Sequence, residues 1–123
     1  MTARIGVLVV DDSDAYLRAA IDVVQASSGF ELVGTATSGE EAVAVAAATT
    51  PDLVLMDVRM PGIGGLEAAR RIREAQPATV VALITAEAGV NSGDTACAVI
   101  DKRDLTPGAL IEIWQDGSGA PVP

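Results

Sequence analysis

Short aliphatic runs recur along the chain, and the segments between them show helical spacing. The runs predict five strands, at residues 5–10, 30–36, 53–56, 80–84 and 98–100. The first run is apolar almost throughout, which is typical of a strand that is buried on both faces. The pattern therefore indicates a sheet whose strands are covered from both sides.

Four further segments predict helices. Ser13 is a suitable N-cap for a helix that ends near Ala26, and Ser38 for a second helix that runs through an alanine-rich stretch. A third helix is expected at 66–75 and a last one at 106–114, with a proline suited to its first turn. The alternation of strands and helices with short turns predicts an α/β domain with a parallel sheet and helices on both faces.

Two segments depart from this regular pattern. Residues 87–96 contain two glycines, an asparagine and a serine, a poor composition for a helix. Residues 117–123 are rich in glycine and proline and are linker-like. We therefore expect one domain over residues 1–116, followed by a flexible tail over residues 117–123.

The composition excludes several classes of function. The chain has 123 residues, with 8 basic against 17 acidic residues and a net charge of -9. This charge argues against a nucleic-acid interface on the domain's own surface, since phosphate binding needs basic patches. The absence of histidine excludes His-dependent hydrolase triads and the commonest zinc sites.

The cellular setting is expected to be the cytoplasm. Cys97 is the single cysteine, so no intrachain disulfide can form, and a reducing compartment is the default. No stretch is apolar enough to span a membrane, and the first dozen residues do not resemble a secretory signal. We expect a soluble protein that does not bind a membrane.

Polar residues lie at the ends of four predicted strands. They are Asp11 and Asp12 after the first strand, Asp57 after the third, Thr85 after the fourth and Lys102 after the fifth. Ligands bind beyond the carboxyl ends of the strands in such sheets, so we expect these residues to line one crevice. Three neighbouring carboxylates repel one another, and a bound cation keeps them ionised. A set of oxygen ligands suits Mg2+.

These groups are suited to phosphoryl transfer onto a carboxylate. Asp57 would attack and form an acyl phosphate, while the metal and Lys102 neutralise the charge of the transferred group. The Thr85 hydroxyl would bond an oxygen of the same group. Single residues have structural alternatives, because Asp12 could cap the first helix and Asp57 could simply end a buried strand. Their joint occurrence at strand ends favours a common site.

The motifs around these residues resemble the receiver domain of two-component response regulators. The similar stretches are Val7-Leu8-Val9-Val10-Asp11-Asp12-Ser13, Asp57-Val58-Arg59-Met60-Pro61 with Gly65 following, Ile84-Thr85-Ala86, and Lys102. The resemblance extends over about residues 4–114 and implies a flavodoxin-like fold with strand order 2-1-3-4-5. It also implies that Asp57 accepts a phosphoryl group from a sensor histidine kinase. The protein would then be a signalling switch that catalyses only its own phosphorylation and dephosphorylation.

The resemblance further implies a set of metal ligands. Asp12 and Asp57 would bind Mg2+ directly, with the Arg59 carbonyl as a further ligand. Asp11 would act through a water molecule. No other cofactor is implied.

The resemblance also implies roles in switching and in its duration. Thr85 and Lys102 would contact the phosphoryl group and couple it to a conformational change. Arg59 and Glu87 match the two variable positions that tune dephosphorylation in the family. Their opposite charges predict a pair across the mouth of the site that hinders an attacking water.

Two features depart from the usual receiver pattern, and a third narrows the resemblance to one kind of receiver. Val99 stands three positions before the lysine, where the family usually has an aromatic residue. The segment between Thr85 and Lys102 is short, so the family's fourth helix is expected to be shortened or irregular. The residues after Lys102 are similar to receivers of the NarL/FixJ kind, often joined to a helix-turn-helix domain. We therefore expect an output such as transcription, with DNA bound only through a domain absent from this chain, and a second copy of the chain as a candidate partner.

Three alternatives remain beside a phosphorylatable receiver. A pseudo-receiver would keep the acidic pocket as a protein-interaction module whose output no longer follows phosphorylation, and Val99 motivates this hypothesis. A nucleotide or flavin binder is less favoured, because Asp11 and Asp12 would repel an unneutralised phosphate. A haloacid-dehalogenase-type phosphatase is less favoured because Arg59 stands where that class has its second aspartate.

Overall fold

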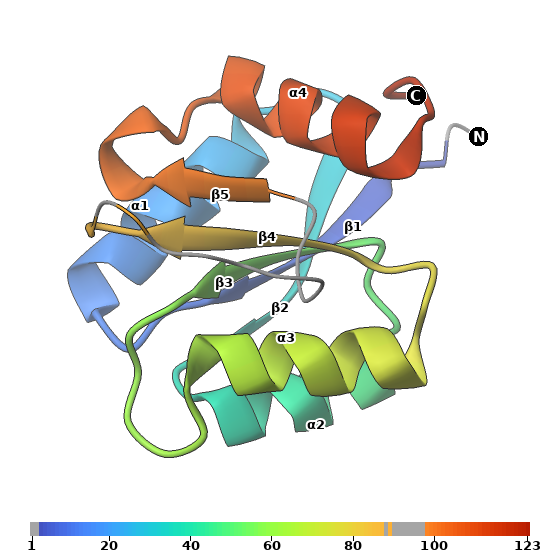
Figure 1. Ribbon diagram of the computed structural model, residues 1–123. Helices are drawn as coiled ribbons and strands as arrows, with labels where there is room; N and C mark the ends of the chain where they lie inside the picture. The colour runs from blue at the N-terminus through green and yellow to red at the C-terminus, as the bar shows by residue number, and fades with distance from the viewer. Residues whose placement is uncertain (1–2, 88, 90–97) are drawn as a thin grey trace.

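The computed structural model of the protein describes residues 3–87, 89 and 98–123. Five parallel strands form one sheet in the order β2-β1-β3-β4-β5, and helices cover both of its faces (Figure 1). The strands are β1 (Ile5–Val10), β2 (Phe30–Ala36), β3 (Leu53–Asp57), β4 (Val80–Thr85) and β5 (Ala98–Asp101). The α-helices of the described residues are α1 (Asp14–Gln25), α2 (Gly39–Thr49), α3 (Gly64–Ala75) and α4 (Pro107–Ser118), and a 3-10 turn, η1 (Lys102–Asp104), follows β5. The predicted flavodoxin-like fold is confirmed.

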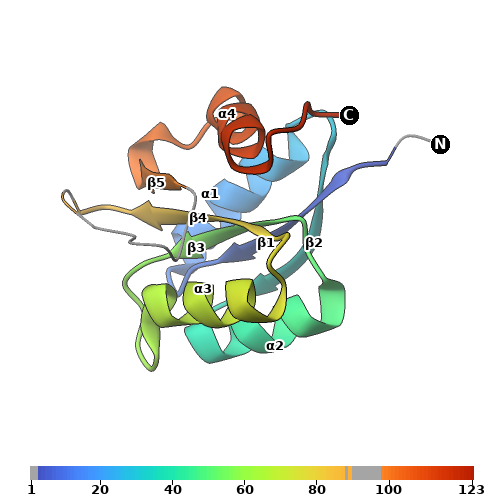
Figure 2. The ribbon, with the colours of Figure 1, turned by 45° about the vertical axis from the view of Figure 1, so that its right-hand side comes forward.

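The sheet separates two hydrophobic cores. Alternate side chains of β1 point to opposite faces, so that Val7 and Val9 join the core under α1 and α4, whereas Leu8 and Val10 join the core under α2 and α3. Figure 2 shows the two helix pairs on either side of the sheet. Because both faces are covered, β1, β3 and β4 are buried along their whole length. This burial explains why their sequences are aliphatic at nearly every position.

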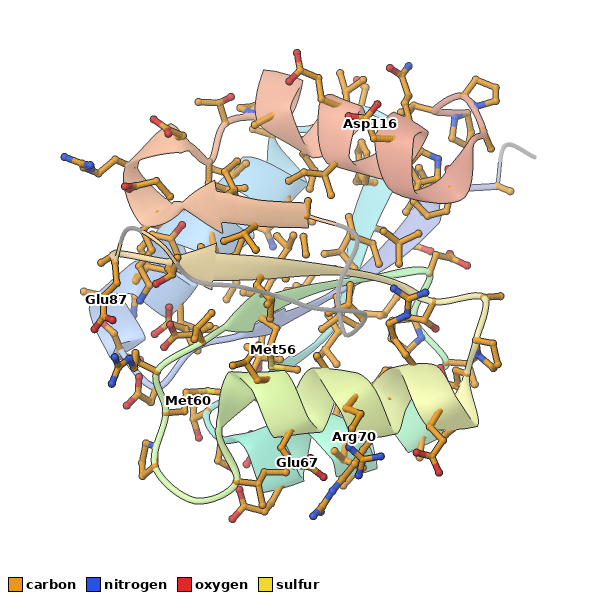
Figure 3. All side chains as sticks on the ribbon, viewed as in Figure 1. Met56, Met60, Glu67, Arg70, Glu87 and Asp116 are labelled. Carbon is orange, nitrogen blue, oxygen red and sulfur yellow. The ribbon has the colours of Figure 1, made fainter. Side chains whose placement is uncertain are left out.

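The helix α3 has one buried and one charged face. Ala68, Ala69 and Ile72 are almost fully buried against the sheet and α2. Glu67 and Arg70 lie on the outer face (Figure 3), where their side chains form an ion pair of 2.7 Å. An exposed pair of this kind contributes at most about 1 kcal/mol, so the burial of the inner face is what holds α3 in place. The small side chains on that face let α3 approach the sheet closely.

The observed boundaries differ from the predicted ones at several element ends. The strand β3 extends to Asp57 and β4 extends to Thr85, so both residues close their strands instead of following them. The helix α3 begins at Gly64, ahead of the predicted start at residue 66. The last helix continues to Ser118, beyond its predicted end at residue 114. The expectation of a short or irregular helix over residues 87–96 falls largely outside the described residues.

The end of the chain folds back against the domain. The backbone of Gly119 adopts a positive φ of 69°, which reverses the chain direction after α4. The Trp114 indole nitrogen then donates a hydrogen bond to the Pro121 carbonyl oxygen at 3.3 Å, and Val122 packs against the core under α1 and α4. The segment predicted as a flexible tail from residue 117 is thus partly helical and in contact with the domain.

Figure 1 shows that the carboxyl end of the chain lies beside the amino-terminal edge of the sheet, away from the edge where the strand arrowheads point. Among the described residues, no helix has the length and apolar character needed to cross a lipid bilayer.

Gly65 is required where α3 begins against the end of β3. A Cβ at this position would collide with the Asp57 carbonyl oxygen, a main-chain atom that no rotamer change can move away. We expect Gly65→Ala to lower the free energy of unfolding by about 3 kcal/mol. Gly108 on α4 is the matched control, because a Cβ there would meet nothing closer than the Thr106 hydroxyl at 3.9 Å. Gly108→Ala should raise the free energy of unfolding by about 0.5 kcal/mol, as measured by urea unfolding. Equal stabilities of the two variants would contradict this account.

Candidate functional site

The ends of neighbouring strands bring all five predicted site residues to one edge of the sheet. Asp11 and Asp12 follow β1, Asp57 closes β3, Thr85 closes β4, and Lys102 follows β5. The strands lie side by side in the order β1-β3-β4-β5, so residues that are far apart in the sequence are neighbours at this edge. The structure thus brings the five residues to one edge of the sheet, and their action as one functional site stays a prediction.

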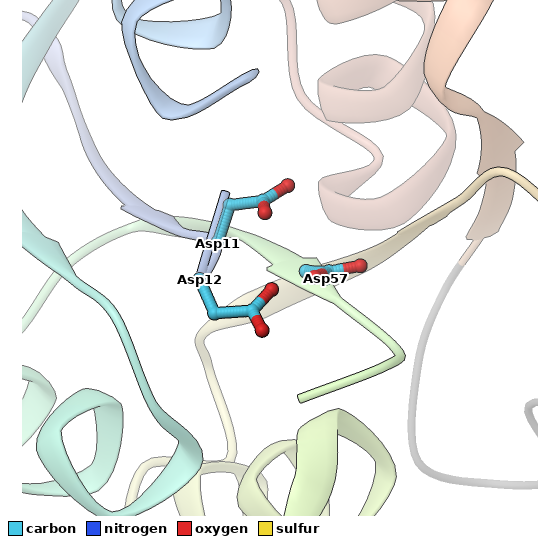
Figure 4. A group of neighbouring side chains, drawn as sticks. All are labelled: Asp11, Asp12 and Asp57. Carbon is cyan, nitrogen blue, oxygen red and sulfur yellow. The ribbon is translucent and has the colours of Figure 1, made fainter. Parts of the chain in front are cut away.

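The three aspartates form a compact cluster. One carboxylate oxygen from each of Asp11, Asp12 and Asp57 lies within 4.8 Å of the others. Figure 4 shows the side chains converging from the ends of β1 and β3. Asp11 and Asp57 are only 1% and 3% exposed, whereas Asp12 faces solvent. A cluster of oxygens that is open on one side suits a divalent cation that keeps several waters.

Asp11 is held by the backbone through one of its carboxylate oxygens. Its Oδ1 atom accepts a hydrogen bond from the Ser13 amide at 2.8 Å. Its Oδ2 atom is buried and accepts no hydrogen bond of regular geometry from the residues that the structure describes, although the Lys102 ammonium lies 2.7 Å away. This short contact is therefore an electrostatic ion pair without regular hydrogen-bond geometry. A buried carboxylate oxygen without a regular hydrogen bond fits a position beside a cation or its bound water.

The alternative role of Asp12 as a helix cap is wrong. Ser13 occupies the N-cap of α1, and its hydroxyl accepts a hydrogen bond from the Tyr16 amide at 3.4 Å. The cap therefore leaves the Asp12 carboxylate in the acidic cluster.

Lys102 bridges the two buried carboxylates. Its Nζ atom lies 2.7 Å from Asp11 Oδ2 and 3.5 Å from Asp57 Oδ1. The lysine side chain is 19% exposed, so its charge is only partly screened by solvent. The ammonium thus offsets part of the repulsion between two carboxylates that the fold places together.

Burial and charge raise the pKa of Asp57 to about 6, from its usual value of 3.8. The largest cause is the removal of the carboxylate from water, and the negative charge of Asp11 acts in the same direction. The Lys102 ammonium and a hydrogen bond from the Arg59 backbone lower the pKa of Asp57, but they compensate only in part. Asp57 therefore titrates close to neutral pH and is mostly ionised above it.

The acidic cluster opens into a small cavity of about 170 Å³. Its lining includes predicted site residues from the ends of several strands. The lining residues are Asp12, Asp57, Arg59, Thr85, Ala86, Glu87 and Lys102. A larger cavity of about 270 Å³ lies between residues 50–52 and 76–79. The one charged residue of that lining, Asp52, already accepts a hydrogen bond from the Gly6 amide at 2.9 Å. Of these two cavities, only the smaller one has charged side chains from several strand ends, so it is the candidate functional cavity.

The predicted pair of Arg59 and Glu87 is present at the mouth of this cavity. The Arg59 guanidinium donates a hydrogen bond to Glu87 Oε2 at 2.7 Å, and both side chains are substantially exposed. The Glu87 backbone amide also donates to the Thr85 hydroxyl at 3.0 Å, which connects the main chain of Glu87 to the end of β4. The pair therefore lies across the approach from solvent to the acidic cluster.

Sequence reasoning missed Tyr16 as a neighbour of the site. Its spacing along α1 is typical of the buried face of a helix, and nothing in the sequence indicates a contact with the end of β5. In the structure, the Tyr16 hydroxyl donates to the Lys102 carbonyl oxygen at 3.1 Å. The Lys102 ammonium lies 4.5 Å from the centre of the tyrosine ring.

The fold and the acidic pocket define a receiver domain, and the sequence comparison identifies the family. The pattern of the response regulator receiver domain matches residues 7–101, which is well over half of the chain. The protein belongs to this family of response regulator receiver domains.

Individual relatives agree with this assignment. The chain is 44% identical over 81 residues to the response regulator GacA of Pseudomonas aeruginosa, a match that covers 66% of this chain and 38% of GacA. Among solved structures, the signal receiver domain of the response regulator NarL from Mycobacterium tuberculosis has a TM-score of 0.83 and 26% identity, and the match covers 96% of this chain and 98% of that one. A chain of the CheX-CheY-BeF3-Mg2+ complex from Borrelia burgdorferi has a TM-score of 0.79 and 25% identity, with 92% and 88% covered. The chain spans well under half the length of the curated relatives it matches.

The raised pKa of Asp57 predicts a pH-dependent cost to stability. The folded protein keeps the Asp57 proton up to about pH 6, whereas the unfolded chain releases it near 3.8. The unfolded state therefore binds fewer protons between these values, and the free energy of unfolding falls as the pH rises through them. We expect the free energy of unfolding of Asp57→Asn to exceed that of the wild type by about 3 kcal/mol near pH 7, and the two to be nearly equal below pH 4.

The measurement is urea unfolding across this pH range in the presence of a metal chelator. Asp116→Asn is the matched control, since this aspartate lies exposed on α4 (Figure 3). A stability difference between Asp57→Asn and the wild type that did not change with pH would contradict the expected burial cost.

Proposed function

We propose that this chain is the phosphoryl-accepting switch of a two-component signalling system, with Asp57 as the phosphoacceptor and a sensor histidine kinase as the donor. The observation that carries the proposal is the position of the Asp57 carboxylate. It lies at the end of β3, in a cavity, 3.5 Å from the Lys102 ammonium and beside two further carboxylates. Membership of the receiver family supports the same role.

The proposed reaction is the transfer of a phosphoryl group to a carboxylate oxygen of Asp57. The ionised carboxylate attacks phosphorus, a new oxygen–phosphorus bond forms, and the phosphorus–nitrogen bond of the kinase's phosphohistidine breaks. The bonding electron pair leaves with the imidazole nitrogen. A pKa of about 6 leaves Asp57 mostly ionised at neutral pH, and the Lys102 ammonium is close enough to stabilise the added charge.

The acidic cluster has the donor set that Mg2+ prefers. We propose Asp12 and Asp57 as direct ligands, the Arg59 carbonyl as a further ligand, and Asp11 as a ligand through water. When bound, Mg2+ supplies positive charge that neutralises the carboxylates and the transferred phosphoryl oxygens. The buried Asp11 Oδ2 atom and the compact arrangement of the three carboxylates support this assignment. So does the likeness to a chain from a complex that contains Mg2+ and BeF3.

Thr85 and Lys102 are proposed to connect the phosphoryl group to the rest of the domain. Both residues line the cavity, Thr85 at the end of β4 and Lys102 after the edge strand β5. An additional charge on Asp57 would redistribute the contacts of these side chains and shift the population between two conformations. We propose transcription regulation as the output, through a further domain that binds DNA, and the likeness to the response regulator GacA supports a regulatory output of some kind. We place this signalling in the cytoplasm, and a second copy of the chain is a candidate partner.

A pseudo-receiver is the second candidate function. Val99, which stands where receivers usually carry an aromatic residue, is 39% exposed on β5. A valine at this position lacks the aromatic ring that usually takes part in the switch of the family. The pseudo-receiver would therefore bind its partner equally well with and without a phosphoryl group on Asp57.

The test of the proposed function is intact-protein mass spectrometry after incubation with acetyl phosphate and Mg2+. The wild type should gain one phosphoryl group, Asp57→Asn should gain none, and the matched control Asp116→Asn should behave as the wild type. A chelator should abolish the adduct, because the clustered carboxylates would then repel the phosphate. A folded, Mg2+-binding wild type that formed no adduct would favour the pseudo-receiver.

The pair of Arg59 and Glu87 predicts a longer life for the phosphorylated state. Its position across the mouth of the cavity hinders the approach of a hydrolytic water. We expect Arg59→Gln or Glu87→Gln to shorten the half-life of the phosphorylated protein by about threefold, the scale of an exposed ion pair. The double variant should be no faster than the single ones. Arg70→Gln is the control, because this arginine forms comparable ion pairs on α3. If none of the variants of Arg59 and Glu87 changed the half-life, the role of this pair in hindering hydrolysis would be refuted.

A further inference from the structure

We propose that Tyr16 is a positioning residue that holds Lys102 at the site from both of its ends, an inference that rests on the proposed function for its effect on phosphorylation. The hydroxyl binds the main chain of the lysine, and the face of the ring lies beside its ammonium. Receiver chemistry would then depend on a side chain from α1 that touches neither the metal ligands nor the phosphoryl group.

The two contacts involve opposite parts of Lys102. The Tyr16 hydroxyl donates to the Lys102 carbonyl oxygen at 3.1 Å, and the Lys102 Nζ atom lies 4.5 Å from the ring centre. The second distance is within the range of a cation–π interaction, which is stronger where solvent is partly excluded. The Nζ atom also lies 2.7 Å from Asp11 Oδ2 and 3.5 Å from Asp57 Oδ1.

Lys102 needs such a support because its own element gives it little. It follows β5, an edge strand of four residues, and begins the 3-10 turn η1. Its long, flexible side chain has many rotamers, and each of them that points away from Asp57 lowers the population of the reactive arrangement. Tyr16 removes part of this freedom, because the same rigid ring fixes the base of the lysine and covers its end.

Tyr16 itself is firmly placed. Its amide is bound by the Ser13 cap, and its ring packs against the core under α1 and α4. Burial, and then the negative charges of Asp11 and Asp57, raise the pKa of the Tyr16 hydroxyl to about 12. The hydroxyl therefore keeps its proton and remains a donor at every pH at which the domain works.

The arrangement permits a small movement of the ammonium while the main chain stays bound. Nζ is in contact with Asp11 and lies 3.5 Å from Asp57 Oδ1. A short shift across the ring face would bring it to the Asp57 side of the pocket without breaking the hydroxyl bond to the Lys102 carbonyl. Tyr16 would thus guide the ammonium between the two carboxylates.

The first test is an NMR measurement that does not depend on phosphorylation. Lys102 is the only lysine in the chain, so its ε-methylene signal is assigned without ambiguity. A position over the tyrosine ring should shift this signal upfield in the wild type and in Tyr16→Phe, and the shift should disappear in Tyr16→Leu. An unshifted signal in the wild type would overturn the proposal, whatever the outcome of the phosphorylation experiment.

The second test measures the rate constant of phosphorylation by acetyl phosphate with Mg2+. We expect Tyr16→Leu to lower it about tenfold and Tyr16→Phe, which keeps the ring, only about twofold. In a Lys102→Met background, Tyr16→Leu should have no further effect, because the side chain on which it acts is gone. Ile21→Ala on α1 is the matched control, since Ile21 packs against the same core, and it should leave the rate unchanged.

The outcomes separate the inference from the proposed function. No adduct on the wild type, together with an upfield lysine signal, would refute phosphorylation while supporting the contact. Equal rate losses for Tyr16→Leu with and without Lys102 would mean a general disturbance of α1 and would overturn the positioning role. A phosphorylation rate constant of Tyr16→Leu equal to that of the wild type would also overturn the positioning role. Urea unfolding of each variant confirms that the compared proteins are folded.

Discussion

The close approach of two buried carboxylates is the constraint on which the functional edge of this domain depends. Asp11 and Asp57 are almost completely buried, and the ends of β1 and β3 place them side by side. Such a pair is unfavourable unless positive charge lies within a few ångströms. The Lys102 ammonium provides part of that charge from beyond β4, and its long side chain is what allows a residue after β5 to reach Asp11. The raised pKa of Asp57 indicates that one ammonium offsets the repulsion only in part, and this deficit supports the divalent cation proposed for the same cluster.

The fold was largely predictable because the sheet is buried on both faces. Burial on both sides forces the central strands to be aliphatic throughout, and short turns between strands and helices leave few ways to connect them. The element ends were less predictable, since they depend on tertiary contacts. The carboxyl end of the chain, for example, is held by the hydrogen bond from the Trp114 indole to the Pro121 carbonyl oxygen and by the packing of Val122 against the core. Glycine and proline in this segment suggested a linker, but composition says nothing about such contacts.

The candidate site was predictable to the extent that it follows from strand ends. Asp57, Thr85 and Lys102 could be placed together because parallel strands put their carboxyl ends at one edge. The contact of Tyr16 with Lys102 could not be predicted in this way, since it joins the first turn of α1 to the end of β5. Helical spacing assigns Tyr16 to the core, and the ring does pack there. An amphipathic side chain can fill a core position and present its hydroxyl to a site, and spacing alone records only the first of these roles.

The same charge imbalance that makes the pocket costly makes it suited to switching. In the proposed function, a phosphoryl group on Asp57 would replace one negative charge by about two, in a place where solvent screens little. Redistributing a partly buried ion pair involves several kcal/mol, which is comparable with the free-energy difference that usually separates two conformations of a domain. Lys102 touches Asp11, Asp57 and Tyr16, and it directly follows β5, so a change at one carboxylate reaches both α1 and the edge of the sheet. The exposed valine on β5, in place of an aromatic residue, then changes the surface that a partner would contact at that edge. It does not change whether the added charge on Asp57 alters the contacts of Lys102.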